Sequence, residues 1–156
     1  MQLAADWFEW DLSTHTLTVK GQIPNTGFLN LSSLAFNTGD HTIDNVEKVV
    51  FTDGAKTGSD ADRLFYAMKE LTSIEGLEYL DTSSATNMEK MFMDRTRFTS
   101  LDLSHFDTSR VTDMSQMFQG CTSLKILNLG SFDTSKVTDM EAMFASCTSL
   151  KTICIR

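Results

Sequence analysis

The sequence has little proline, little cysteine and no long apolar run. Among its 156 residues Pro24 is the single proline, and no Pro- or Gly-rich linker divides the chain. No apolar run approaches the roughly 20 residues of a membrane-spanning helix. The start, MQLAADWFEWD, lacks the basic and apolar regions of a signal peptide. These absences argue against a membrane span and against linked domains, and they predict a protein that is cytoplasmic or has lost a targeting segment.

Basic residues are also few. The chain has 13 Lys and Arg against 21 Asp and Glu, giving a net charge of −8, and the basic residues are scattered. Binding to a phosphate backbone needs clustered Lys and Arg, so nucleic acid is not expected as a partner. With 41% hydrophobic and 22% charged residues, the chain has the composition of one folded domain.

Much of the chain consists of an internal repeat. Residues 101–126, LDLSHFDTSRVTDMSQMFQGCTSLKI, match residues 127–152, LNLGSFDTSKVTDMEAMFASCTSLKT, at an offset of 26. The segment LDTSSATNMEKMF, residues 80–92, carries the same phrase 26 residues before the first of these. Such a fixed period is typical of stacked repeat architectures, in which each unit completes the core of its neighbours.

A second pattern, LxxLxL, follows each Met-Phe pair. It begins at Phe98, Leu124 and Leu150, and more loosely at Val46 and Leu71, so the spacings along the chain are 25, 27, 26 and 26. The last apolar pair of each pattern alternates with a polar residue, which is strand spacing. Each unit is therefore expected to contribute one short strand to a continuous parallel sheet.

The rest of each unit is predicted to form a short helix. Val111, Met114, Met117 and Phe118 stand at i, i+3, i+6 and i+7, which is one face of a helix. Thr86 with Glu89, and Thr138 with Glu141, match a capping box, and Gly120 follows the last helical position. The Met-Phe pairs could form a soft recognition surface, but at this spacing the core interpretation is favoured.

Together these patterns predict an α/β fold, a right-handed solenoid of short parallel strands and short helices over residues 46–156. Residues 1–45 do not match the repeat and are expected to form a small N-terminal β cap. WFEWDLSTHTLTVKG within this segment is typical of a β-hairpin, and Phe28, Leu29, Leu31, Leu34 and Phe36 would complete the cap. Trp7 and Trp10 could bind carbohydrate, but a core role is favoured.

The LxxLxL units resemble leucine-rich repeats, and the phrase FDTS-x-VTDM-x-x-MF-x-x-C-x-SL resembles the BspA-like leucine-rich-repeat surface proteins of bacteria. The resemblance runs from about Val46 to Ile155. It implies a secreted or cell-wall-associated protein that adheres to host matrix proteins, to cell-surface proteins or to glycans. It also implies a binding scaffold rather than an enzyme. The chain ends on the strand of an unfinished unit, KTICIR, so we expect a fragment of a longer array.

Two sets of carboxylates recur at the repeat distance: Asp81, Asp107 and Asp133, and Asn87, Asp113 and Asp139. Stacked carboxylates could hold Ca²⁺. The favoured interpretation is that the first set accepts local backbone hydrogen bonds in turns, and that Asp113 and Asp139 complement helix N-termini.

Cysteine and histidine do not form a recognisable active site. Cys121 and Cys147 occupy one repeat position and are expected to be buried free thiols, with Cys154 exposed on the strand. His15, His41 and His105 are isolated from one another, and no CxxC, phosphate loop or catalytic triad pattern is present. The sequence therefore predicts no catalytic residue, no metal site and no cofactor.

Ligand binding is predicted on the strand face, at positions that differ between units: Asp102, Ser104, His105, Asn128 and Ser131. Two alternatives to an adhesion module remain open, a structural stalk or spacer and an intracellular protein–protein scaffold. End-to-end self-association through an open edge is a further expectation.

Overall fold

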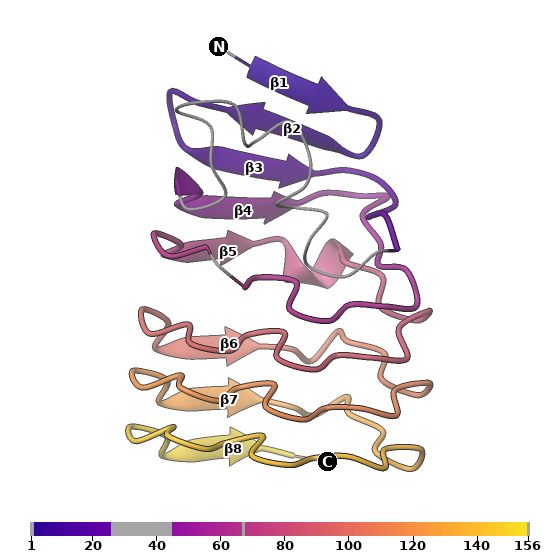
Figure 1. The fold of residues 1–156 in the computed structure, drawn as a ribbon, viewed down its shortest axis with the longest axis vertical. Coiled ribbons are helices and arrows are strands. Elements are labelled where there is room, and N and C mark those ends of the chain that lie inside the picture. The colour runs from indigo at the N-terminus through magenta and orange to yellow at the C-terminus, as the bar shows by residue number, and fades with distance from the viewer. Residues whose placement is uncertain (1, 26–44, 67, 156) are drawn as a thin grey trace.

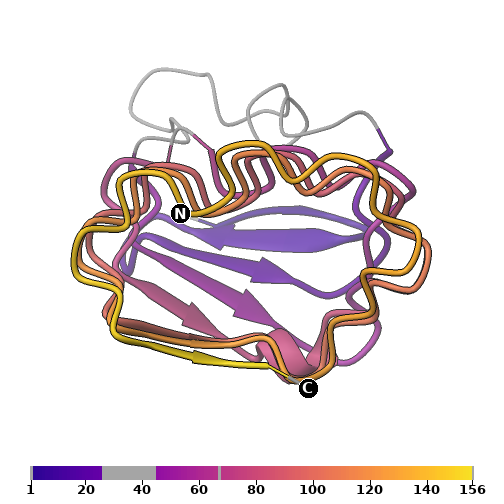
Figure 2. The ribbon, with the colours of Figure 1, turned by 90° about the horizontal axis from the view of Figure 1, so that it is seen from below.

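The computed structural model describes residues 2–25, 45–66 and 68–155. The described chain coils into a stack of rungs, where a rung is the stretch from one strand to the next (Figure 1). Each rung carries its strand on the same side of the stack. Viewed along the stack, the rungs after residue 100 nearly superimpose, whereas the earlier strands fan out from one another (Figure 2). The repeat therefore corresponds to equivalent layers, as the sequence predicts.

The N-terminal strands are antiparallel and continue into the repeat. β1 (Gln2–Ala5), β2 (Phe8–Asp11) and β3 (Thr16–Val19) form a meander, and β3 pairs in parallel with β4 (Lys48–Phe51). The predicted hairpin is confirmed, with Trp10 opposite Leu17. It covers the edge of β4 as part of the same sheet. The rest of the predicted cap, at residues 26–44, lies outside the described residues, and the boundary at residue 45 stays a prediction.

The strands of the repeat fall into two parallel groups. β5 (Ser73–Glu75) pairs with β4 and closes the first sheet. β6 (Ser100–Asp102), β7 (Ile126–Asn128) and β8 (Thr152–Cys154) form the second. Leu101, Leu127 and Ile153 are register partners in turn, which confirms the alignment expected from the 26-residue offset.

The expectation of one continuous sheet is wrong at β5 and β6, which are not paired. The interruption coincides with the unit of 27 residues, from Ile74 to Leu101. After β5 the chain also makes an additional turn, the 3₁₀ helix η3 (Leu77–Tyr79), which starts at Gly76 with φ 74°. A Cβ at Gly76 would lie 2.1 Å from the Phe51 carbonyl oxygen, so only glycine fits this approach.

The expectation of short helices in each unit is also wrong, since the described residues contain no α-helix. Lys90, Gln116 and Ala142 stand at one repeat position and have φ values of 56°, 56° and 53°. A left-handed residue at this place interrupts a right-handed helix. The predicted capping threonines reach across rungs instead: Thr86 Oγ1 donates to Ser59 O, and Thr138 Oγ1 to Thr112 O.

The burial pattern nevertheless agrees with the prediction of a Met/Phe core. Val111, Met114, Met117 and Phe118 are all fully buried. The phenylalanines stack along the coil, with ring centroids 5.6 Å apart for Phe92 and Phe118 and 5.8 Å for Phe118 and Phe144. Periodic apolar residues can thus face one core from a series of turns as well as from a helix.

Trp7 and Trp10 belong to the core at the N-terminal end of the stack. Their side chains are 8% and 0% exposed. The core interpretation is confirmed, and a carbohydrate-binding role for these rings is excluded by their burial.

The Asp-Thr-Ser phrase joins each rung to the next. Asp107 Oδ1 accepts hydrogen bonds from the Ser109 amide at 2.9 Å and the Ser109 hydroxyl at 2.6 Å, which closes the turn. The buried Thr108 hydroxyl donates to Asp133 O at 3.0 Å and accepts from Asp133 N at 2.8 Å in the following rung. Thr82 makes the same pair of bonds with Asp107. The phrase recurs because each rung needs both a turn and a link.

The last described rung leaves part of the core surface open. Its apolar side chains are 43% exposed at Met140, 38% at Phe144, 40% at Ile153 and 75% at Ile155. They border a depression of about 400 Å³ at this end of the stack. Equivalent positions one rung earlier are buried, because the last rung covers them.

Candidate functional site

The five predicted ligand-binding residues lie on or beside strands β6 and β7. Asp102 and Asn128 end these two strands and are register partners. Ser104 and His105 follow β6, and Ser131 follows β7. The structure therefore places all five on one side of the stack, although whether they bind a ligand stays a prediction.

Asp102 and His105 are the exposed members of this set. Asp102 Oδ1 accepts a hydrogen bond from the Ser104 amide at 3.0 Å. Hydrogen bonds from the Ser104 side chain and backbone lower the pKa of the Asp102 carboxyl, outweighing a small desolvation effect. Asp102 thus offers a fixed negative charge at neutral pH.

Ser131 and Asn128 are half-buried, and both make hydrogen bonds to the backbone. The Ser131 hydroxyl contacts Leu103 O at 3.0 Å and Phe106 O at 2.7 Å in the preceding rung. Asn128 Oδ1 accepts the Gly130 amide at 3.0 Å. Ser131 therefore links two rungs, which leaves its hydroxyl less available to a ligand than the carboxylate of Asp102.

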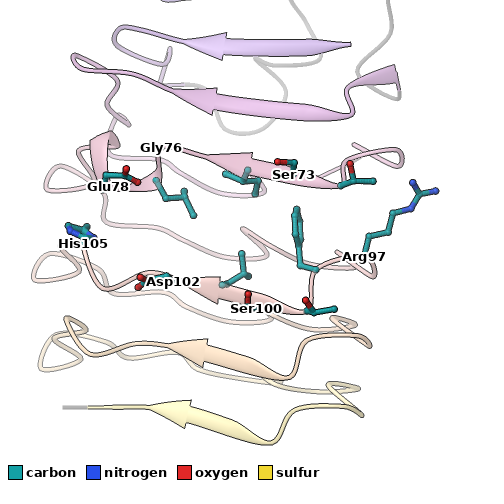
Figure 3. A pocket seen from close by; sticks show the side chains of 13 residues that line it. Ser73, Gly76, Glu78, Arg97, Ser100, Asp102 and His105 are labelled. Atoms are coloured by element: carbon teal, nitrogen blue, oxygen red, sulfur yellow. The ribbon is translucent and has the colours of Figure 1, made fainter. Parts of the chain in front are cut away.

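The interruption of the sheet opens a cleft on the same face, about 760 Å³ in volume (Figure 3). We call it the β5–β6 cleft, lined by residues 72–74, 76–78, 97–102 and 105. Apolar side chains of Ile74, Leu77, Phe98 and Leu101 are among its lining, and Phe98 and Leu101 are buried in the core below.

The two ends of the β5–β6 cleft differ in charge. Figure 3 shows Glu78, Asp102 and His105 at one end and Arg97 at the other. Arg97 already contacts Glu70 at 3.2 Å, whereas Glu78 and Asp102 make no ion pair with another described residue. One end of the cleft is thus acidic and open to a cation.

Sequence reasoning found Asp102 and His105 of this cleft but missed Ile74, Glu78 and Arg97. The available signal was the spacing of 27 between the second and third LxxLxL patterns, which marks the interruption. This spacing gave no indication that β5 and β6 separate, because one extra residue usually lengthens a loop or forms a bulge without breaking strand pairing.

The recurring aspartates act in turns. Asp81, Asp107 and Asp133 each accept the amide two residues later, at 2.9 Å. Asp113 and Asp139 accept the amides of Ser115 and Glu141 at 2.8 Å, in turns rather than at helix N-termini. The described residues contain no group of three His, Cys, Asp or Glu placed to hold a metal ion. The turn interpretation is confirmed for the first set.

The cysteines are free thiols in a graded series. Cys121 is buried and Cys154 exposed, as expected, whereas Cys147, expected to be buried, is half-buried in the last described rung. Cys121 Sγ lies 3.1 Å from Phe92 O, and Cys147 Sγ 3.0 Å from Phe118 O one rung on. Burial raises the pKa of the Cys121 thiol to about 12, so this sulfur remains protonated and a poor nucleophile.

Parallel strands at a 26-residue register, together with a core repeated in every rung, define the class of a leucine-rich-repeat fold. Among solved structures, the chain resembles a leucine rich cell surface protein from Faecalibacterium prausnitzii A2-165, with 20% identity and a TM-score of 0.51. That match covers 99% of this chain and 39% of the other, so the chain spans well under half of that protein. A leucine rich repeat protein of T. pallidum matches at 11% identity and a TM-score of 0.41, covering 96% of this chain and 91% of the other.

The chain belongs to the family described as Mycoplasma protein of unknown function, DUF285, whose model matches residues 59–154. No curated protein matches the sequence. Within the described residues, no helix has the length and apolar character needed to cross a membrane.

Proposed function

We propose that this chain is the ligand-binding part of a bacterial cell-surface adhesion protein, related to the BspA-like proteins, and that it has no catalytic activity. The observation that carries the proposal is the strand face. A rigid repeated backbone presents side chains there that differ between rungs, with exposed Asp102 and His105 beside Asn128 and Ser131. Extended repeat surfaces of this kind bind partners along their length.

The similarity to a leucine rich cell surface protein supports an extracellular or cell-wall location for this chain. The proposed partners are host extracellular-matrix proteins, cell-surface proteins or glycans, without a cofactor. The alternatives are a structural stalk that projects other domains and an intracellular interaction scaffold. The net charge of −8 favours partners with basic patches in either compartment.

A binding panel tests the adhesion proposal against the stalk. The purified chain is applied to immobilised collagen, fibronectin and laminin and to a glycan array, with biolayer interferometry for any hit. We expect saturable binding to at least one surface, weakened at least tenfold in the double variant Asp102→Lys/Asn128→Lys. The matched control is Asp107→Lys/Asp133→Gln, which makes the same total charge change and removes equivalent turn bonds away from the strand face.

Absence of binding to every surface would favour the stalk and contradict the adhesion proposal. Equal loss in the two double variants would also contradict it, because the strand face would then have no special role.

We further propose that a second copy of this chain can dock on the exposed apolar end of the last described rung. Ile153 lies in this face, next to the depression lined by Met143 and Phe144. Burial of such surface provides the main favourable energy of association. Sedimentation velocity should show concentration-dependent association that Ile153→Lys abolishes, and a monomer at all concentrations would contradict the proposal.

A further inference from the structure

The β5–β6 cleft interrupts only the strand side of the stack. On the opposite side the same two rungs remain joined, since Met88 N donates to Asp113 O at 2.9 Å and Phe92 N to Met117 O at 2.9 Å. Asn87 and Asp113 form a parallel bridge there. The two rungs are therefore adjacent along the chain and in space, and they part only where their strands would pair.

The hydrogen-bonding edge of β6 faces this cleft. Successive residues of a strand direct their N–H and C=O groups to opposite edges. Thr99 O accepts from Ile126 N, and Leu103 N donates to Asn128 O, so residues 99, 101 and 103 face β7. Ser100 and Asp102 consequently direct their backbone groups into the cleft.

One backbone edge of β5 faces the β5–β6 cleft from the side opposite β6. Ser73 N donates to Glu47 O, so Ser73 and Glu75 face β4 and Ile74 faces the cleft. No backbone pairing joins β5 to β6 in the described part of the chain. Two parallel edges with free donors and acceptors thus oppose each other across a space of about 760 Å³.

We propose that the β5–β6 cleft binds an extended peptide segment of a partner protein, which adds as a strand between β5 and β6. An exposed strand edge is the template for such strand addition. The inserted strand would lie about 4.8 Å from each neighbour and would replace the missing pairing on both sides. This inference rests on the proposed function, because it specifies how the strand face would bind a protein partner.

The side chains of the cleft define the chemistry of that segment. Residues of an inserted strand alternate between the core and the solvent. Inward residues meet Ile74 and Leu101, so they are apolar. Because both neighbours run in one direction, a parallel strand places its C-terminal end beside Glu78 and Asp102, where a Lys or Arg finds two carboxylates. The partner segment is therefore an alternating polar and apolar strand that ends in a basic residue.

Amide hydrogen exchange followed by NMR tests the backbone pairing. The probe is the peptide acetyl-Val-Thr-Val-Thr-Val-Lys-amide, in which Lys shares the outward face of the threonines, added to the whole chain. The amides of Ile74 and Asp102 should exchange at least tenfold more slowly with saturating peptide, whereas the amide of Leu127, which faces β8, should not change. A peptide N-methylated at alternate residues should give no protection, because it cannot donate to one edge.

Charge variants test the orientation. Asp102→Lys should bind this probe about five- to tenfold more weakly, and it should gain affinity for a second peptide that has Glu in place of the terminal Lys. Asp107→Lys is the control, since it makes the same charge change and loses the same type of turn bond outside the cleft. Equal behaviour of the two variants would overturn the proposal, as would equal binding of the N-methylated peptide.

Two other outcomes would also overturn it. Protection of Ile74 and Asp102 that rises with protein concentration without peptide would identify a second copy as the occupant. If the chain binds none of the peptides but still binds a matrix protein or glycan through Asp102 and Asn128, the strand-addition proposal is wrong and the adhesion proposal stands. If the chain binds no matrix protein or glycan but the peptide still protects the amides of Ile74 and Asp102, the adhesion proposal is wrong and the strand-addition proposal stands.

Discussion

Replacing Phe118 with alanine is expected to lower the free energy of unfolding by about 3–5 kcal/mol. The ring is fully buried and stacks between Phe92 and Phe144 in the neighbouring rungs. Its removal leaves a cavity shared by three rungs, which the rigid coil cannot close by a local shift. Urea unfolding followed by circular dichroism measures the loss.

The matched control is Phe144→Ala. Phe144 holds the same repeat position in the last described rung, is 38% exposed and stacks on a ring on one side. Its loss should cost about 1–2 kcal/mol, since part of the ring already contacts water. Equal losses of unfolding free energy for Phe118→Ala and Phe144→Ala would contradict the stacked arrangement, because a ring between two rungs should contribute more than a ring in the last described rung.

Replacing Thr108 with valine is the second large effect, with an expected loss of about 2 kcal/mol in the free energy of unfolding. Valine keeps the shape but removes the hydroxyl that donates to Asp133 O and accepts from Asp133 N. Thr108 is 1% exposed, so water does not readily replace these bonds. The same urea titration reports the change.

Thr134→Val is the control for this substitution. Thr134 occupies the repeat position of Thr108 but is exposed in the last described rung. Its change is expected to stay within about 0.5 kcal/mol of wild type. A comparable loss for both threonines would mean that the hydroxyl acts within its own rung and not as a link between rungs.

The alignment of the rungs could be predicted from the sequence, because similar residues recur at a fixed spacing of 26 and so occupy equivalent places in successive rungs. Leu101, Leu127 and Ile153 repeat at 26 residues and prove to be strand partners. Burial of Met117 and Phe118 followed from the same period, because apolar side chains that recur in every rung pack together in the shared core.

Backbone conformation between the strands could not be predicted in the same way. The spacing of Val111, Met114 and Met117 fits a helix, yet Gln116 adopts φ 56° and the segment forms turns. Apolar periodicity reports which side chains face the core, and it leaves open how the chain passes between them. Hydrogen bonds to the next rung, such as Phe118 N to Met143 O at 3.0 Å, replace those of a helix.

The candidate site was predicted in part, for a related reason. Asp102 and His105 differ from their counterparts in the next unit and do line the β5–β6 cleft, whereas Asn128 and Ser131 lie one rung away from it. The cleft itself depends on β5 and β6 failing to pair. Gly76 and η3 lie beside this interruption, and no local sequence pattern shows that the two strands separate there.

The most direct measurement for the whole account is a set of NOEs between methyl groups of Leu101, Leu127 and Ile153 in methyl-labelled protein. Stacked rungs predict strong cross-peaks from Leu127 to both Leu101 and Ile153, and none between Leu101 and Ile153, because one strand separates them. Direct cross-peaks between Leu101 and Ile153, or none from Leu127 to either, would contradict the stack of equivalent rungs.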